Sequence, residues 1–142
     1  MKATKKIILT ILALALVVTA VLGMVACSKP VQMRETEILI TLDKSIMSDI
    51  EGKTLKDYLD LLQEKKYLTY EATGGMLFTI NERKADSTKG EWWLIYTDDE
   101  EHSNEGWGTY QVEEKTYKSS TLGYESLPLK DGATYVFVIS KF

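Results

Sequence analysis

The sequence has little of what enzymes and metal sites are built from. It contains one cysteine, Cys27, and one histidine, His102, among 142 residues. A lone thiol forms no intramolecular disulfide, so the fold must be stabilised by its apolar core. Cys–His catalytic pairs and zinc sites with several histidines are excluded, and a Ser–His–acid triad would need His102, which follows four acidic residues. We therefore expect no enzymatic activity.

Acidic residues are missing from the first 26 positions. These positions hold Lys2, Lys5 and Lys6 and then an apolar run over residues 7–23, a pattern typical of a secretion signal. Beyond Cys27 lie all 21 acidic residues but only 14 of the 17 basic ones, a net charge of −7. That charge disfavours nucleic acid as a partner and disfavours contact between the protein surface and an anionic membrane.

The residues before the cysteine, Gly23-Met24-Val25-Ala26-Cys27, resemble a lipobox, the signal of bacterial lipoproteins. The resemblance implies cleavage before Cys27 and acylation of its thiol. We expect a lipoprotein signal peptide over residues 1–26, a lipidated N-terminus and tether over 27–34, and one domain over 35–142. The protein would then be anchored by lipid on the extracytoplasmic face of the cell membrane. The alternative is an uncleaved transmembrane anchor over residues 7–26.

Apolar periodicity predicts a single α+β domain. Residues 54–66 are expected to form a helix with Thr54 as its cap and Leu55, Tyr58, Leu59 and Leu62 on its buried face. Strands are predicted over residues 35–43, 76–81, 91–97 and 134–140, the first with one buried face and the last apolar on both faces and central. Residues 98–108 read as a polar loop and 109–117 as an edge hairpin. One helix packed on one mixed sheet, the β-grasp layout, would bury these faces.

From residue 54 onward the chain resembles the transcobalamin-type C-terminal domain, the β-grasp half of the animal cobalamin carriers. That domain also occurs in bacterial surface lipoproteins. The matching segments are, in order, residues 54–57 (TLKD) with the helix after them, 67–71 (YLTYE), Gly75 with 77–79 (LFT), 91–95 (EWWLI) with Asp98, Gly123-Tyr124, and 128–132 (PLKDG) with the last strand.

In the cobalamin carriers this domain closes over one face of the corrin ring. The resemblance thus implies a corrinoid such as cobalamin as a candidate ligand. We expect a non-catalytic surface module that captures a corrinoid or another small flat molecule and passes it to a membrane importer. The first candidates are the residues at the positions where the family contacts its ligand. Tyr96 is added because Trp and Tyr are common at recognition surfaces. The candidate ligand-binding residues are Trp92, Trp93, Leu94, Tyr96, Leu122, Gly123 and Tyr124.

Two alternatives stay open for this aromatic region. Trp92 and Trp93 are adjacent on a strand and face opposite sides, so one could belong to the core and the other to a covered outer face. The aromatic surface could also dock onto another envelope protein, which would make the chain a structural or interaction module without a small ligand.

The acidic run Asp98, Asp99, Glu100 and Glu101 is the weak candidate for a metal site. Calcium needs six to eight oxygen ligands from a defined loop, and the EF-hand spacing is absent. We expect a solvated loop here and no resident metal.

Overall fold

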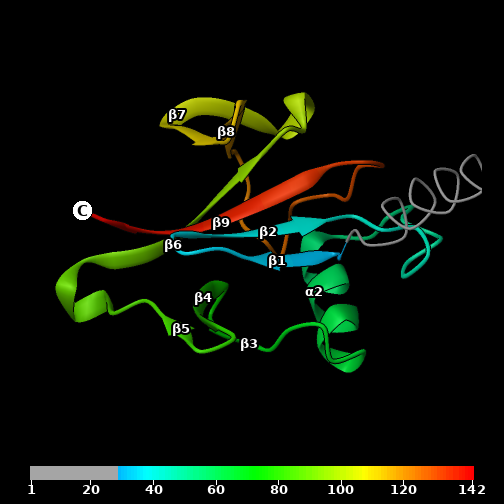
Figure 1. Cartoon of the computed structure of the whole chain (residues 1–142), viewed down its shortest axis with the longest axis horizontal. Coiled ribbons are helices and arrows are strands. Elements are labelled where there is room, and N and C mark those ends of the chain that lie inside the picture. Colours follow the sequence, from blue (N-terminus) through cyan, green and yellow to red (C-terminus); the bar gives the residue numbers. More distant parts are fainter. Residues whose placement is uncertain (1–28) are drawn as a thin grey trace, which may run out of the picture.

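A computed structural model describes residues 29–142. The signal peptide predicted over residues 1–26 and the predicted lipid-acceptor residue Cys27 lie outside the described residues. Residues 29–142 form an α+β domain with a six-stranded antiparallel sheet, a small three-stranded sheet and an α-helix (Figure 1). No helix in residues 29–142 is both long and apolar enough to cross a membrane.

The large sheet has the strand order β1-β2-β9-β6-β8-β7. Its strands are β1 (Val31–Met33), β2 (Glu37–Thr41), β6 (Glu91–Thr97), β7 (Ser103–Val112), β8 (Lys115–Ser120) and β9 (Thr134–Lys141). Strand β9 lies between β2 and β6, as its apolar character on both faces predicted. Every pairing in the described part is antiparallel, so the prediction of a mixed sheet was wrong.

Helix α2 (Leu55–Glu64) follows the sequence prediction closely. Thr54 caps its first turn, and Asp57 completes a capping box, because each of the two side chains accepts a hydrogen bond from the backbone N–H of the other. The buried residues of the helix are the four that its periodicity indicated, Leu55, Tyr58, Leu59 and Leu62. They pack on one face of the large sheet in the main core cluster.

The small sheet consists of β3 (Tyr70–Thr73), β4 (Met76–Ile80) and β5 (Arg83–Lys84). Its first hairpin turns at Gly74 and Gly75, which both have positive φ, a backbone conformation that glycine adopts without steric cost. Two 3₁₀ turns, η1 (Ser87–Lys89) and η2 (Glu100–His102), flank β6. The sequence predicted the strand at β4 but not that it belongs to a separate sheet.

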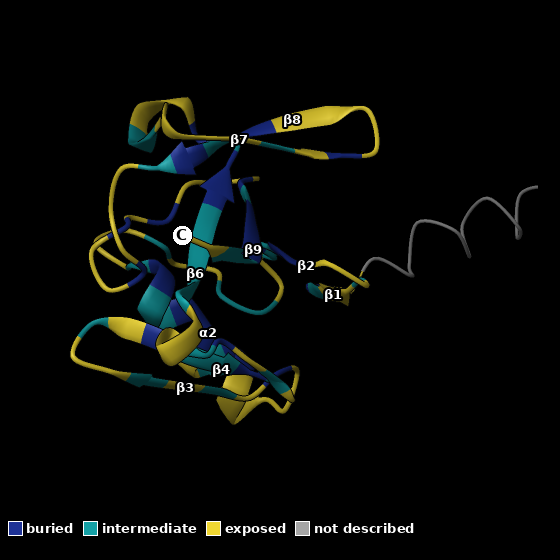
Figure 2. Cartoon of the chain, turned by 90° about the vertical axis from the view of Figure 1, so that its left-hand side faces the viewer, coloured by how far each residue is buried: buried dark blue, intermediate teal, exposed yellow. Residues whose placement is uncertain are grey.

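The large sheet is covered on both faces. Helix α2 and the small sheet lie on one side of the central strands, and the β7–β8 hairpin lies on the other (Figures 1 and 2). A second core cluster therefore forms under the hairpin, where Leu39 joins Tyr117 and Val136. Residues 37–40 of β2 are consequently buried on both faces, which corrects the prediction of one buried face.

Two segments differ from their predicted conformations. Residues 103–108, assigned to a polar loop, belong to β7 and extend the predicted hairpin. Val31–Met33, placed in the tether by the sequence, forms β1 and pairs with β2. Most residues of both segments are exposed, so their sequences lack the apolar pattern of a buried strand. Pairing with a neighbouring strand holds them extended instead.

Candidate functional site

The candidate residues gather where β6 and β8 part. Strand β6 pairs with β8 at only two positions, Tyr96 and Thr97, so residues 91–95 have no strand partner on that side in the described part. Two hollows open along this unpaired stretch. They share Trp93, Ile95 and Gly123 in their walls.

The two hollows differ in the face toward which they open. The outer hollow, about 250 Å³, lies toward the β7–β8 hairpin, and its walls add Leu94, Trp107 and Leu122. The inner hollow, about 220 Å³, lies toward the helix side, and its walls add Leu77, Trp92 and Tyr124. All lining residues of both hollows belong to the described part, and none carries a charge. Such walls favour a neutral, largely apolar ligand.

The adjacent tryptophans point to opposite faces of β6, and neither is sealed inside the protein. The Trp93 indole Nε1 donates a hydrogen bond to the carbonyl oxygen of Phe78 on β4 at 3.0 Å. Its ring packs against the helix-side core. This bond orients the indole and joins the two sheets, and Trp93 lines both hollows.

Strand β8 stops pairing with β6 after Ser119 because the chain turns at Ser120. The Ser120 hydroxyl donates to the Leu122 carbonyl oxygen at 2.7 Å and accepts from the Leu122 N–H at 3.3 Å. Thr121 N–H donates to the His102 carbonyl oxygen at 2.9 Å. A serine that bonds the backbone two residues on offers the chain a turn in place of strand pairing. The turn presents Leu122, which is 40% exposed, at the mouth of the outer hollow.

Trp107 is the most exposed of the wall residues that the sequence did not nominate. It is 65% exposed and lies in a bulge of β7, where the pairing jumps from Asn104–Ser119 to Thr109–Lys118. The buried Ser119 hydroxyl donates to the Asn104 carbonyl oxygen at 2.7 Å and accepts from the Trp107 N–H at 3.2 Å. These two bonds hold the bulge, and the Trp107 ring packs at 5.8 Å from the Phe142 ring.

The flanking glycines are the signal that could have revealed this bulge. Gly108 adopts a φ of +87°, which side-chain-bearing residues rarely do. A Cβ on Gly106 would lie 3.0 Å from the Asn104 side-chain oxygen. A tryptophan between two glycines directly before a predicted hairpin therefore indicates a bulge that exposes the ring.

Tyr96 does not line either hollow. Its ring is 5% exposed and packs at 5.5 Å from the Tyr110 ring in the second core cluster. Its hydroxyl donates to the Trp107 carbonyl oxygen at 3.5 Å. The sequence placed Tyr96 among the ligand contacts, but in the structure it is absent from the walls of both hollows and its hydroxyl bonds to the β7 bulge.

Tyr124 forms the floor of the inner hollow. It is buried, packs edge-on against Tyr70 at 6.1 Å, and its hydroxyl donates to Glu125 Oε1 at 3.4 Å. Burial, followed by the negative charge of Glu125, raises the pKa of Tyr124, so the phenol stays neutral at physiological pH.

One protein family matches part of the chain. Residues 52–117 match the model of a family described as a domain of unknown function, DUF4430. No curated protein and no solved structure matches the chain. The DUF4430 match runs from just before α2 into β8, so it includes β6 and the Trp107 bulge and ends before Leu122, Gly123 and Tyr124.

Of the acidic segment 98–101, Glu100 and Glu101 are exposed to solvent and Asp98 is partly exposed, whereas Asp99 is buried. Asp99 caps η2 and is buried, with its carboxylate 2.9 Å from His102 Nδ1 and 3.4 Å from Lys130 Nζ. Although burial alone would raise it, the pKa of Asp99 is lowered by its bonds to His102, to the Glu101 N–H and to Lys130. Asp99, Glu101 and His102 have oxygen and nitrogen atoms within 4.8 Å of one another. Lys130 already supplies the positive charge that a cation would bring to Asp99.

We expect Asp99→Asn to lower the free energy of unfolding by about 1–3 kcal/mol, because the amide cannot pair with the Lys130 ammonium. Chemical denaturation of the full chain in detergent micelles measures the loss. The matched control is Glu101→Gln, an exposed neighbour, with an expected change within about 0.5 kcal/mol. If calcium at about 1 mM stabilised the native chain but not the Asp99→Asn variant, the segment would instead be a metal site.

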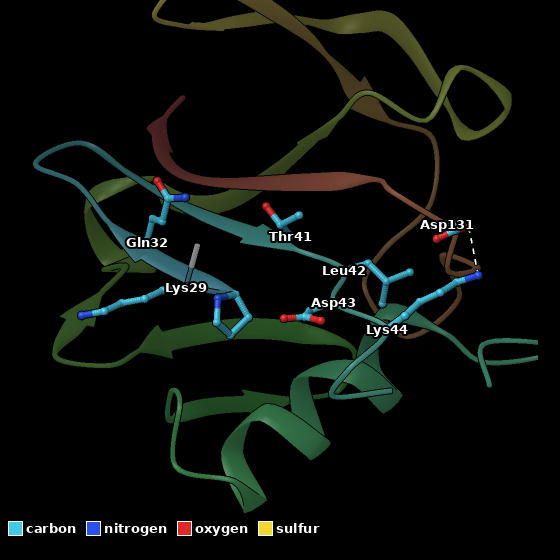
Figure 3. A pocket seen from close by; sticks show the side chains of 8 residues that line it. Lys29, Gln32, Thr41, Leu42, Asp43, Lys44 and Asp131 are labelled. Atoms are coloured by element: carbon cyan, nitrogen blue, oxygen red, sulfur yellow. Dashed lines mark ion pairs between the residues drawn. The ribbon is translucent and has the colours of Figure 1, made fainter. Parts of the chain in front are cut away.

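Another hollow, about 370 Å³, lies near the first described residues, between Lys29 and Asp131 (Figure 3). Its walls carry charges of both signs, but Lys44 forms an ion pair with Asp131 at 2.9 Å. Asp43 is bonded to the Ser45 hydroxyl and N–H at 2.7 and 2.8 Å. Because these charged groups bond to the protein itself, this hollow is a weaker candidate than the Trp93 region.

Proposed function

We propose that this chain is a non-catalytic binding module, held by lipid on Cys27 at the extracytoplasmic face of the cell membrane. It captures a flat, neutral small molecule and passes it to a membrane importer. The observation that carries the proposal is the pair of uncharged hollows that meet at Trp93. A half-buried indole between two apolar hollows offers its face to a flat ligand while staying fixed in orientation.

The domain type that we propose is the transcobalamin-like β-grasp. Its support is the element order, in which the first long strand is followed by a helix that packs on one face of the sheet. Strands β2 and β9, near the two ends of the domain, also lie side by side. The wholly antiparallel pairing departs from the mixed sheet expected from this class.

The ligand class that we propose is a corrinoid, on the strength of the resemblance. Six of the seven candidate residues from the sequence line the two hollows, from β6 and from the turn after β8. The neutral lining agrees with a ligand held by its apolar ring rather than by charged groups.

Cyanocobalamin is expected to bind the full chain in detergent micelles with saturation by tens of micromolar. Equilibrium dialysis measures retention, and quenching of tryptophan emission reports contact with the site. Trp93→Ala should weaken binding at least tenfold, which corresponds to about 1.4 kcal/mol. The matched control is Tyr67→Ala, an exposed aromatic outside both hollows, which should bind unchanged. Absence of retention would reject a corrinoid as the ligand.

A second candidate function is docking onto another envelope protein. It is favoured by the exposed apolar side chains at the rims of the hollows, Met76, Trp107 and Leu122. Exposed large apolar groups around a groove mark interaction surfaces.

A further inference from the structure

The outer hollow has hydroxyl groups in its walls beside the apolar side chains. Ser120 and Thr121 belong to its lining together with Trp107 and Leu122. The Ser120 hydroxyl already donates its proton to the Leu122 carbonyl oxygen and accepts from the Leu122 N–H. Because a serine hydroxyl has one proton and two acceptor lone pairs, Ser120 can only accept a further hydrogen bond. A ligand group that bonds to Ser120 must therefore be a donor.

Thr121 adds a second hydroxyl to the same wall. Its backbone is fixed, since its N–H donates to the His102 carbonyl oxygen at 2.9 Å, and the residue is exposed. Within residues 29–142 its side-chain oxygen makes no hydrogen bond. This hydroxyl can both donate and accept. Two neighbouring hydroxyls, one of them limited to accepting, suit a ligand that carries several hydroxyls of its own.

Trp107 places a flat apolar surface beside these hydroxyls. Its ring is 65% exposed and packs edge-to-face with the Phe142 ring, at 5.8 Å and an interplanar angle of 74°. One neighbouring ring in this geometry covers at most one face of the indole. The other face is open to a ligand, while the bulge bonds of Ser119 hold the Trp107 backbone in place.

Gly123 keeps the shared wall of the hollows free of a side chain. Among the glycines of the described part, it alone has neither a positive φ nor a protein atom within 4 Å of an added Cβ. Neither backbone conformation nor packing within residues 29–142 thus requires glycine at this position. A glycine of this kind allows a ligand to approach the backbone closely.

We propose that the outer hollow binds one neutral pyranose ring of a saccharide. The ring lays its C–H face on the Trp107 indole, and its hydroxyls donate to the Ser120 oxygen and bond to the Thr121 hydroxyl. At about 250 Å³ the hollow is smaller than the about 300–1,000 Å³ of drug-sized sites, so it holds a single ring. Its uncharged walls favour a neutral sugar over an acidic one. The proposal rests on the proposed binding role of this surface but not on a corrinoid ligand.

The position of Trp107 and Phe142 argues against a lipid surface as the occupant. The Pro30 carbonyl oxygen bonds to Thr41, and Thr41 pairs with Thr134 at the start of β9. Phe142 follows the end of β9, and the eight residues of this strand span about 25 Å. Figure 1 shows the C-terminus on the far side of the domain from β1 and β2 where they begin and end near Pro30. An anchor at position 27 therefore places the bilayer nearer the other end of the sheet.

Cellotriose, a neutral chain of β-1,4-linked glucose rings, is the probe. The full chain is held in dodecylphosphocholine micelles, because this detergent has no sugar headgroup to compete. Titration should shift the indole N–H signal of Trp107 in NMR spectra with a dissociation constant of about 1 mM or tighter. Sorbitol, which has the hydroxyls but no ring, should leave the signal unchanged at the same concentrations.

Matched variants separate stacking from hydroxyl recognition, with binding of each variant followed on the sugar signals by saturation transfer. Trp107→Ala should weaken cellotriose binding at least tenfold, and Trp107→Phe should stay within about threefold of the native chain. Thr121→Val should weaken binding about threefold or more, and Thr121→Ser should restore it. Tyr67→Ala, an exposed aromatic outside the hollow, should bind as the native chain does.

No shift at 20 mM cellotriose, an equal response to sorbitol, or native affinity in Trp107→Ala would overturn the saccharide proposal. Cyanocobalamin retention is measured separately, so the two proposals fail independently. Retention of cyanocobalamin without cellotriose binding rejects the saccharide site alone. Binding of cellotriose without cyanocobalamin retention rejects the corrinoid alone.

Discussion

Phe137→Ala is expected to lower the free energy of unfolding by about 3–5 kcal/mol. Phe137 is fully buried at the centre of β9, opposite Ile38 on β2 and Ile95 on β6. Truncation leaves a cavity beneath α2 in the main core cluster. Because a domain of this size has a total stability of about 5–15 kcal/mol, the variant should be largely unfolded at mild denaturant concentrations.

Chemical denaturation of the full chain in micelles, followed by tryptophan emission, gives this number. Phe142→Ala is the matched control, since that ring is 68% exposed and packs at 5.8 Å from the exposed Trp107 ring. Its expected change is within about 0.5 kcal/mol. A loss below 1 kcal/mol for Phe137→Ala would contradict the central place of β9 in the fold.

Cys27→Ala is expected to abolish lipid attachment entirely. The substitution removes the single thiol of the chain, so the acyl transfer that precedes signal cleavage has no acceptor. The variant should accumulate as an uncleaved precursor without labelled fatty acid. Metabolic labelling with a radioactive fatty acid, together with the mass of the protein, measures both effects.

Ser28→Ala is the control for this substitution, because it changes the adjacent residue and leaves the acceptor in place. It should be cleaved and labelled as the native chain is. Fatty acid on the Cys27→Ala variant, or an unmodified thiol on the mature native chain, would contradict the lipoprotein interpretation and favour an uncleaved transmembrane anchor.

Local sequence signals predicted the parts of the fold that local physics determines. The helix at α2 follows from Thr54 as cap and from apolar residues at helical spacing. Strand β9 is central because its residues are apolar on both faces. In both cases the side-chain pattern itself states which faces are to be buried.

Long-range pairing could not be predicted from local patterns. The antiparallel direction of every strand pair depends on which segments meet, and β1 pairs with β2 although Gln32 and Met33 are exposed. The same holds for residues 103–108 of β7, where the buried hydroxyl of Ser119 replaces apolar burial as the stabilising contact. A polar stretch held by a neighbouring strand looks like a loop in the sequence.

Most of the nominated residues lie together in the structure, but the geometry that brings them together was not predicted from the sequence. Trp93 and Tyr124 line the hollows, but the site exists because β8 leaves β6 at Ser120, and that departure depends on side-chain bonds of a serine in a polar stretch. Trp107 lines the outer hollow and Tyr96 does not, because the bulge of β7 lies between them. The bulge that exposes Trp107 also covers Tyr96.

The strand register also sets how far along the sheet Trp93 lies from the first described residues. Thr41 N–H bonds to the Pro30 carbonyl oxygen, so the first described residues lie at the end of β2 that is level with Thr97 on β6. Trp93 is four residues, about 13 Å, farther along the strands toward the opposite pole of the molecule. If position 27 is fixed to lipid, the bilayer lies nearer the Thr97 end of β6 than the Trp93 end. Incoming molecules would then meet Trp93 from the aqueous side, before they reach the headgroups.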